Sequence, residues 1–155
     1  MARPLIWFVS PLSILKLCQL VCLVLVVVFF IDGRIQWKIY SVIYALAFTL
    51  SFGCILNILL HYFEAPKIAN TLPWMNMELL WNATGLVLCI LSSTILIWDW
   101  WRMHNGHLEH HATLPPRNIG ESRWQRRVAI NAGSLFLAAC LFLFVWMKVR
   151  KTGIH

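Results

Sequence analysis

The sequence predicts an all-α integral membrane protein, a single bundle of four membrane-spanning helices. Hydrophobic residues make up 60% of the 155-residue chain and charged residues only 12%. Soluble domains carry roughly 45–50% apolar and ~25% charged residues, so a small soluble domain could not bury this much apolar surface. The composition therefore excludes a soluble enzyme, a secreted disulfide scaffold and a disordered linker.

The apolar residues are gathered in four continuous runs, which cover residues 12–31, 39–63, 77–98 and 128–147. Each run reaches the ~20 residues that a helix needs to cross the hydrocarbon layer of a bilayer. The runs do not alternate between apolar and polar residues, so they predict helices rather than the strands of a barrel. We expect one membrane domain, 1–155, with a histidine-rich connection at 99–127.

Aromatic and sulfur-containing residues fit this division of the chain. The nine tryptophans fall near the ends of the runs, as expected for side chains that settle at the level of the lipid headgroups. All five cysteines lie inside the runs and none in a connection. We therefore expect a belt of interfacial tryptophans and no loop disulfide.

Polar residues inside the runs are candidates for contacts between helices. Amides interrupt the runs at Gln19, Asn57, Asn82 and Asn131. A buried amide needs a hydrogen-bond partner, so we expect these side chains to face the bundle. Small residues such as Gly133 allow close helix approach, and we expect Gly133 to pack inside the bundle, with self-association as the alternative. Lys16 and Glu78 are the charged residues of the runs, and we expect both to reach water at a helix end, which disfavours a transporter.

The formal net charge of +7 is scattered around the ends of the runs, so it does not predict nucleic-acid binding. Two dense basic groups flank the fourth run, namely Arg123, Arg126 and Arg127 before it and Lys148, Arg150 and Lys151 after it. Each basic residue beside anionic lipid gains ~1 kcal/mol. We therefore expect these six side chains to contact lipid headgroups. The basic residues divide almost equally between the two sides of the membrane, which leaves the orientation open.

The third connection contains a group of histidines, His104, His107, His110 and His111. Histidines three or four residues apart can bind a metal ion from one helix face. Residues 107–111 also match the His-x-x-His-His box of membrane di-iron desaturases and hydroxylases, whose chemistry needs several such boxes. Because the chain has one box, we expect neither a catalytic centre nor a cofactor. Incidental Zn²⁺ or Cu²⁺ binding stays open, and we interpret the segment as a polar, protonatable loop beside the membrane.

Three parts of the sequence resemble the MARVEL-domain proteins, in particular the MAL, plasmolipin and chemokine-like-factor members. In residues 10–33, Lys16 and Gln19 precede a leucine-rich run. In residues 73–97, Glu78 is followed by two patches of small residues, and the fourth run has Asn131 near its start and a basic tail. The resemblance implies cytosolic termini and a non-catalytic protein of the plasma membrane or of endomembrane vesicles. Such proteins organise membrane patches, vesicle trafficking, cell contacts or membrane fusion.

Membrane lipids, other integral membrane proteins and further copies of the chain are the partners that this interpretation implies. An accessory subunit of a channel, a transporter or a membrane enzyme complex would have the same composition, so this alternative stays open. A histidine-box, metal-dependent membrane enzyme is the second alternative, and it predicts bound iron.

Overall fold

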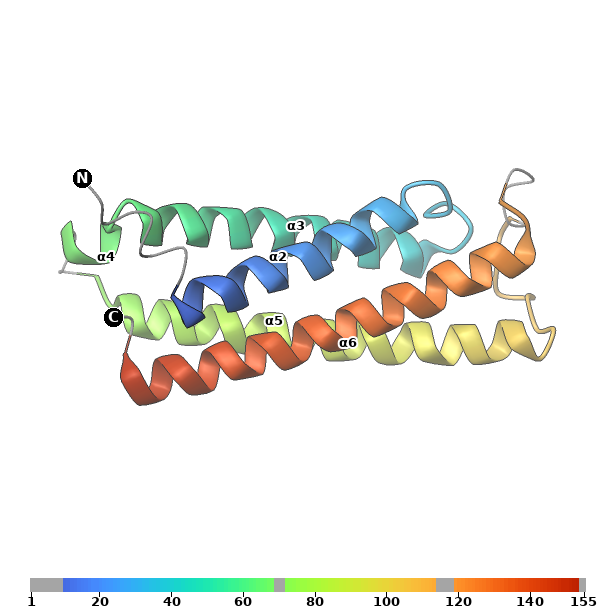
Figure 1. The fold of residues 1–155 in the computed structure, drawn as a ribbon. Helices are drawn as coiled ribbons and strands as arrows, with labels where there is room; N and C mark the ends of the chain where they lie inside the picture. The colour runs from blue at the N-terminus through green and yellow to red at the C-terminus, as the bar shows by residue number, and fades with distance from the viewer. Residues whose placement is uncertain (1–9, 69–71, 114–118, 154–155) are drawn as a thin grey trace.

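The structure is a computed structural model that describes residues 10–68, 72–113 and 119–153. Four long helices lie side by side along the molecule (Figure 1). They are α2 (Pro11–Phe30), α3 (Lys38–Tyr62), α5 (Trp74–His104) and α6 (Glu121–Thr152), and the short α4 (Ala65–Ile68) follows α3. The described residues contain no strand. The all-α four-helix bundle that the sequence predicts is therefore confirmed.

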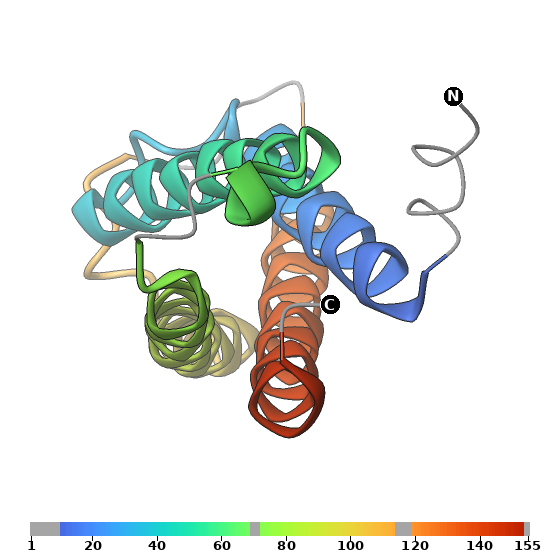
Figure 2. The same ribbon diagram turned by 90° about the vertical axis from the view of Figure 1, so that its left-hand side faces the viewer.

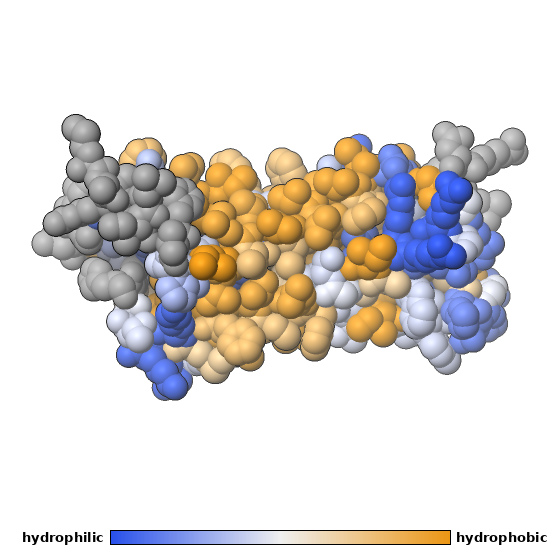
Figure 3. All heavy atoms as spheres, in the orientation of Figure 1, coloured by the Kyte–Doolittle hydropathy of each residue, from blue (hydrophilic) through white to orange (hydrophobic). Residues whose placement is uncertain are grey.

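All four long helices are long and apolar enough to cross a membrane. Large apolar side chains such as Phe52 and Leu80 point away from the bundle and are 64% and 70% exposed. On the face shown in Figure 3, apolar residues cover the middle of the molecule and hydrophilic residues gather at its two ends. A surface of this kind needs lipid around its middle, so the chain is a multi-pass membrane protein.

The first two helices match the predicted spans to within one residue at each end. Helix α2 begins after Ser10, whose hydroxyl accepts a hydrogen bond from the Ser13 amide at 3.3 Å. Helices α5 and α6 extend well beyond their predicted spans. In α5 this is because no helix-breaking residue follows residue 98 until Asn105 and Gly106. Gly106 adopts a φ of 77°, which favours glycine. The connection between α5 and α6 is consequently residues 105–120.

The helices pack in a partly open ring, seen end-on in Figure 2. Helix α5 packs on α6, α6 on α2, and α2 on α3, whereas α3 and α5 approach each other less closely. Helices α5 and α6 pack closely at Gly85, where a Cβ atom would stand 2.6 Å from the Phe142 ring. Nearby, the Ser93 hydroxyl donates to the Ala132 carbonyl at 2.9 Å. The wider gap between α3 and α5 is where polar side chains meet.

The tryptophan near the start of α6 departs from the interfacial belt. Trp98 and Trp101 are exposed near the end of α5, as a belt residue should be. Trp124 is instead completely buried, with its ring centroid 5.9 Å from Phe30 and 5.6 Å from Tyr40. The turn between α2 and α3 makes room for it at Gly33, where a Cβ atom would overlap the indole ring. Trp124 therefore belongs to the core.

Candidate functional site

Polar side chains are buried at both ends of the bundle, and we call the first group the Glu78 cluster. It consists of Lys16, Gln19, Asn57, His61, Glu78 and Asn82. Lys16 Nζ lies 2.8 Å from Glu78 Oε1, and their side chains are only 3% and 4% exposed. The expectation that both residues reach water is wrong. Each side chain lies on the inner face of its helix, where the other neutralises its charge.

The amides complete the Glu78 cluster. Asn57 on α3 accepts a hydrogen bond from Lys16 and donates to Glu78 Oε2 at 2.6 Å. Asn82 donates to Glu78 Oε1 at 2.9 Å and accepts a longer bond of 3.4 Å from Gln19. His61 Nε2 lies 3.5 Å from Glu78 Oε2. The network therefore crosslinks α2, α3 and α5, as predicted for interhelical amides.

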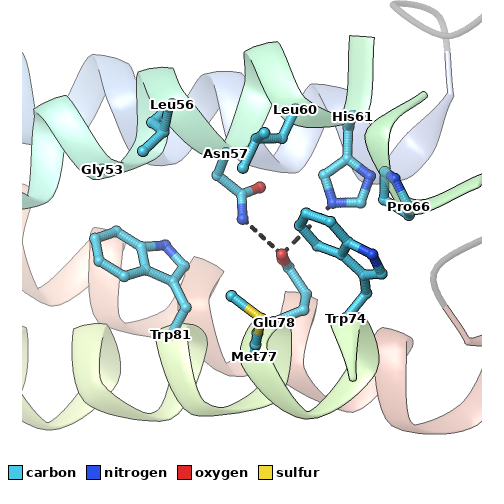
Figure 4. Close-up of a pocket in the computed structure, with 10 residues that line it drawn as sticks. All are labelled: Gly53, Leu56, Asn57, Leu60, His61, Pro66, Trp74, Met77, Glu78 and Trp81. Carbon is cyan, nitrogen blue, oxygen red and sulfur yellow. Dashed lines mark hydrogen bonds and ion pairs between the residues drawn. The ribbon is translucent and has the colours of Figure 1, made fainter. Parts of the chain in front are cut away.

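A pocket of about 200 Å³ opens beside this cluster, between α3 and α5. Figure 4 shows Asn57 and His61 extending from α3 toward Glu78 on α5, with indole rings on either side. Most of the lining side chains are apolar, including Leu56, Met77 and Trp81. Because the Glu78 carboxylate is already paired with an ammonium and two amides, the pocket wall offers an apolar surface rather than a free acid or base.

The second group, the Asp99 cluster, consists of Tyr40, Asp99, His110 and His111. Asp99 lies near the end of α5 and is completely buried. The Tyr40 hydroxyl at the start of α3 donates to Asp99 Oδ2. The Nε2 atoms of His110 and His111 lie 2.6 and 3.1 Å from Asp99 Oδ1. Both histidines come from the loop after α5, so this loop folds back onto the end of the bundle.

Two further features fix the loop against the bundle. The Ala112 amide donates to the Gln36 carbonyl at 2.7 Å, which joins the loop to the turn between α2 and α3. Aromatic rings surround the histidines, with Trp37 and Trp98 at 5.0 and 5.6 Å from the His110 ring. The side chain of His111 is 2% exposed and that of His110 is 15% exposed. The cluster is therefore nearly closed to solvent, with its one partly open side at His110.

The five residues predicted for helix packing do not all lie inside the bundle. Gln19, Asn57 and Asn82 meet in the Glu78 cluster. Asn131 is completely buried on α6, and its side-chain amide has no hydrogen-bond partner within the described residues. Gly133 does not pack inside the bundle as predicted. It is exposed on the outer face of α6, because buried residues of that helix such as Leu135 and Ala139 fall on the other side.

The six basic residues predicted to contact headgroups lie at the two ends of α6. Arg123 and Arg126 are exposed, and Arg127 Nη1 forms an ion pair with Asp32 Oδ2 at 2.8 Å. At the other end Lys148 is half-buried, Lys151 is exposed, and the Arg150 guanidinium lies 5.4 Å from the centre of the Trp146 ring. These positions are accessible to headgroups, and the lipid contact itself stays a prediction.

Only two of the four candidate histidines come together. His104 is exposed and stacks on Trp100 at 5.8 Å, and His107 is exposed on the loop. His110 and His111 instead converge on Asp99, a residue that the sequence interpretation left in the connection. The sequence did contain a signal for Asp99: it is an acidic residue that directly follows an apolar run and precedes a group of histidines by a few residues. Tyr40 gave no signal, because a tyrosine at the start of a span is ordinary.

No protein-family model, curated protein or solved structure matches the chain. The fold and the buried polar clusters define its class: an all-α, four-helix, multi-pass membrane protein whose two ends are each closed around a buried carboxylate.

Proposed function

We propose that the chain is a non-catalytic multi-pass membrane protein that acts through lateral contacts in the bilayer. In this role it organises membrane patches, vesicle trafficking, cell contacts or membrane fusion, in the plasma membrane or in endomembrane vesicles with both termini in the cytosol. Membrane lipids, other integral membrane proteins and further copies of the chain are its partners. Lys16 and Glu78 are paired with each other inside the bundle, and apolar residues cover the middle of the molecular surface in Figure 3, so the contacts that the bundle offers within the bilayer are apolar ones.

The observation that carries this proposal is a groove on the outer face of α5 and α6. Gly133 is exposed there, and apart from its chain neighbours and the adjacent backbone of α6 no described atom lies within 4 Å of the place where its Cβ would stand. Ile97, Trp100, Ala129 and Phe136 line the groove, whose volume is about 310 Å³. A glycine and an alanine one turn apart let a second helix approach to backbone distance, where van der Waals packing is strongest.

Crosslinking in native membranes tests the proposal. Gly133→Leu fills the groove, and Ala45→Leu adds the same side chain at an exposed position of α3 as a matched control. We expect the wild-type chain to crosslink to several membrane proteins in variable proportion, as identified by mass spectrometry. Gly133→Leu should lose most of these crosslinks and Ala45→Leu should keep them.

Two results would contradict the proposal. Crosslinks that survive Gly133→Leu unchanged would show that the groove is not a contact surface. A single partner at fixed stoichiometry, whose loss destabilises the chain, would instead favour an accessory subunit of a membrane complex. Both variants must first elute from a sizing column in detergent as the wild-type chain does.

A further inference from the structure

The Asp99 cluster brings together three side chains that each offer one metal-ligating atom. Asp99 Oδ1 and the Nε2 atoms of His110 and His111 all lie within 4.8 Å of one another. The other carboxylate oxygen, Oδ2, accepts the hydrogen bond of Tyr40. The phenol thus fixes the carboxylate and leaves Oδ1 directed at the two imidazoles. An oriented carboxylate with two imidazoles is a donor set that divalent transition-metal ions take.

Two of the three distances between these atoms can be compared with those of a tetrahedral site. Two ligands at the usual Zn–N distance of about 2.0–2.1 Å, separated by the tetrahedral angle, stand roughly 3.3 Å apart. Asp99 Oδ1 lies 2.6 Å from His110 Nε2 and 3.1 Å from His111 Nε2. The remaining pair, the two Nε2 atoms, lies within 4.8 Å. A cation between the three donor atoms therefore requires the side chains to adjust until each donor atom reaches bonding distance.

Charge supplies the second argument. Asp99 is 0% exposed, and in the part of the chain that the structure describes its partners are two imidazoles and one phenol. None of these groups carries a permanent positive charge, since a histidine is charged only when protonated. A buried carboxylate without a counter-charge is costly. A divalent cation supplies that charge and replaces the close contacts between donor atoms by bonds to the ion.

The surroundings suit a bound ion. Trp37 and Tyr40 cover the histidine rings at 5.0 and 5.5 Å, which keeps water away from most of the cluster. The 15% exposed side chain of His110 leaves one side through which an ion and a water molecule can enter. Three protein ligands and one water molecule are a regular coordination set for zinc.

We propose that Asp99, His110 and His111 bind a divalent cation of the Zn²⁺ type, which fastens the loop after α5 to the end of the bundle. Tyr40 is a positioning residue, because its hydroxyl donates to the carboxylate and lies 3.4 Å from His111 Nε2 without being one of the three ligands. The ligand set differs from the histidine box of the sequence. It uses two of the four histidines of that segment together with an acidic residue of the membrane helix.

The test uses the full chain purified in mild detergent and freed of metal with a chelator. Titration with Co²⁺, which reports tetrahedral coordination by its visible absorption, should show about one ion per chain, displaced by Zn²⁺. His110→Ala and His111→Ala should each weaken binding by more than about 100-fold, and Tyr40→Phe by about 10- to 100-fold. His104→Ala and His107→Ala are matched controls, because these exposed histidines lie outside the cluster, and they should bind as the wild type does.

Three results would overturn the proposal. The first is a wild-type chain that gives no tetrahedral Co²⁺ spectrum. The cation would then be absent, and a proton on a histidine would be the remaining source of a counter-charge for Asp99. The second is an equal loss of binding in His107→Ala, which would show adventitious binding by the loop. The third is a melting temperature that Zn²⁺ raises as much in Asp99→Asn as in the wild type. If His111→Ala fails to fold, His110→Gln, at the partly exposed ligand, gives the same comparison.

Discussion

The bundle buries a carboxylate at each end, Glu78 near the start of α5 and Asp99 near the end of the same helix. Glu78 has Lys16 at 2.8 Å as its counter-charge, and every partner comes from a long helix. Asp99 has two histidines and a tyrosine, and the histidines come from a loop. The first end is electrically complete with the residues of the chain alone. The second end has no permanent counter-charge among the described residues, and the cation that we propose there would make it the end that responds to its surroundings.

The largest expected effect comes from removing the counter-charge at the complete end. Lys16→Met leaves Glu78 buried without its ammonium partner, and breaking a buried ion pair in this way costs about 3–5 kcal/mol. The free energy of unfolding in mixed micelles, followed by the loss of helical circular dichroism, measures the effect.

The double variant Lys16→Met/Glu78→Gln is the control for this change. It removes both charges and keeps an amide oxygen that can still accept a hydrogen bond from Asn57, so it should recover most of the lost stability. If the double variant is as unstable as Lys16→Met, Lys16 is not the counter-charge of Glu78. The two ends would then no longer differ in whether the buried carboxylate has a counter-charge within the chain.

A smaller effect is expected from glycines that lie against an indole ring at each end. A Cβ at Gly53 would overlap Trp81 beside the Glu78 cluster, and a Cβ at Gly33 would overlap Trp124 near the Asp99 cluster. Overpacking of a close contact costs about 1–3 kcal/mol, so Gly53→Ala and Gly33→Ala should each lower the free energy of unfolding by that amount.

Gly133→Ala is the matched control for both glycine variants, because open space surrounds the outer face at this position. We expect no loss of stability there. In addition, Gly33→Ala should weaken Co²⁺ binding and Gly53→Ala should not, since only the first glycine lies beside the core residue that packs on Tyr40. Equal effects of the two variants on metal binding would show that the two ends are coupled.

The smallest effect is expected at the edge of the Glu78 cluster. Gln19→Met removes a hydrogen bond of 3.4 Å to Asn82 and keeps a side chain of similar size. Hydrogen bonds between membrane helices contribute about 0.6 kcal/mol on average, so the loss of stability should be close to that value. Val21→Met, at an exposed position of the same helix, is the control. A loss as large as that of Lys16→Met would mean that the amide, and not the ion pair, stabilises this end.

The four helices could be predicted because each apolar run is continuous and long enough to cross a bilayer. The apolar runs do not predict where a helix ends outside the lipid. Helix α5 continues past residue 98 to His104, and α6 begins before residue 128, at Glu121. Helix formation depends on backbone hydrogen bonds and the absence of breakers, whereas the end of an apolar run reports only the edge of the lipid. Asp99 was assigned to a connection for this reason.

The Glu78 cluster was predictable in part. The expectation that Gln19, Asn57 and Asn82 face the bundle is correct, since buried amides require partners. The pairing of Lys16 with Glu78 was missed, because a charged side chain near a helix end can equally well extend to the headgroups. In addition, a single sequence does not show which helices are neighbours in the bundle. Gly133 was assigned to the wrong face for a related reason. A small residue permits close approach but does not say whether the approaching helix belongs to the same chain.

The ion pair between α2 and α5 has a consequence for the order in which the chain is made. Lys16 enters the membrane with the first helix, and its nearest hydrogen-bond partner, Asn57, is 41 residues further along the chain. At about 5–20 residues per second of synthesis, this lysine waits for roughly 2–8 s before that partner exists, and longer still for Glu78. During that interval its ammonium is most stable at the headgroups. We therefore expect the first helix to insert shallowly and to move to its final depth only after the third long helix has been synthesised.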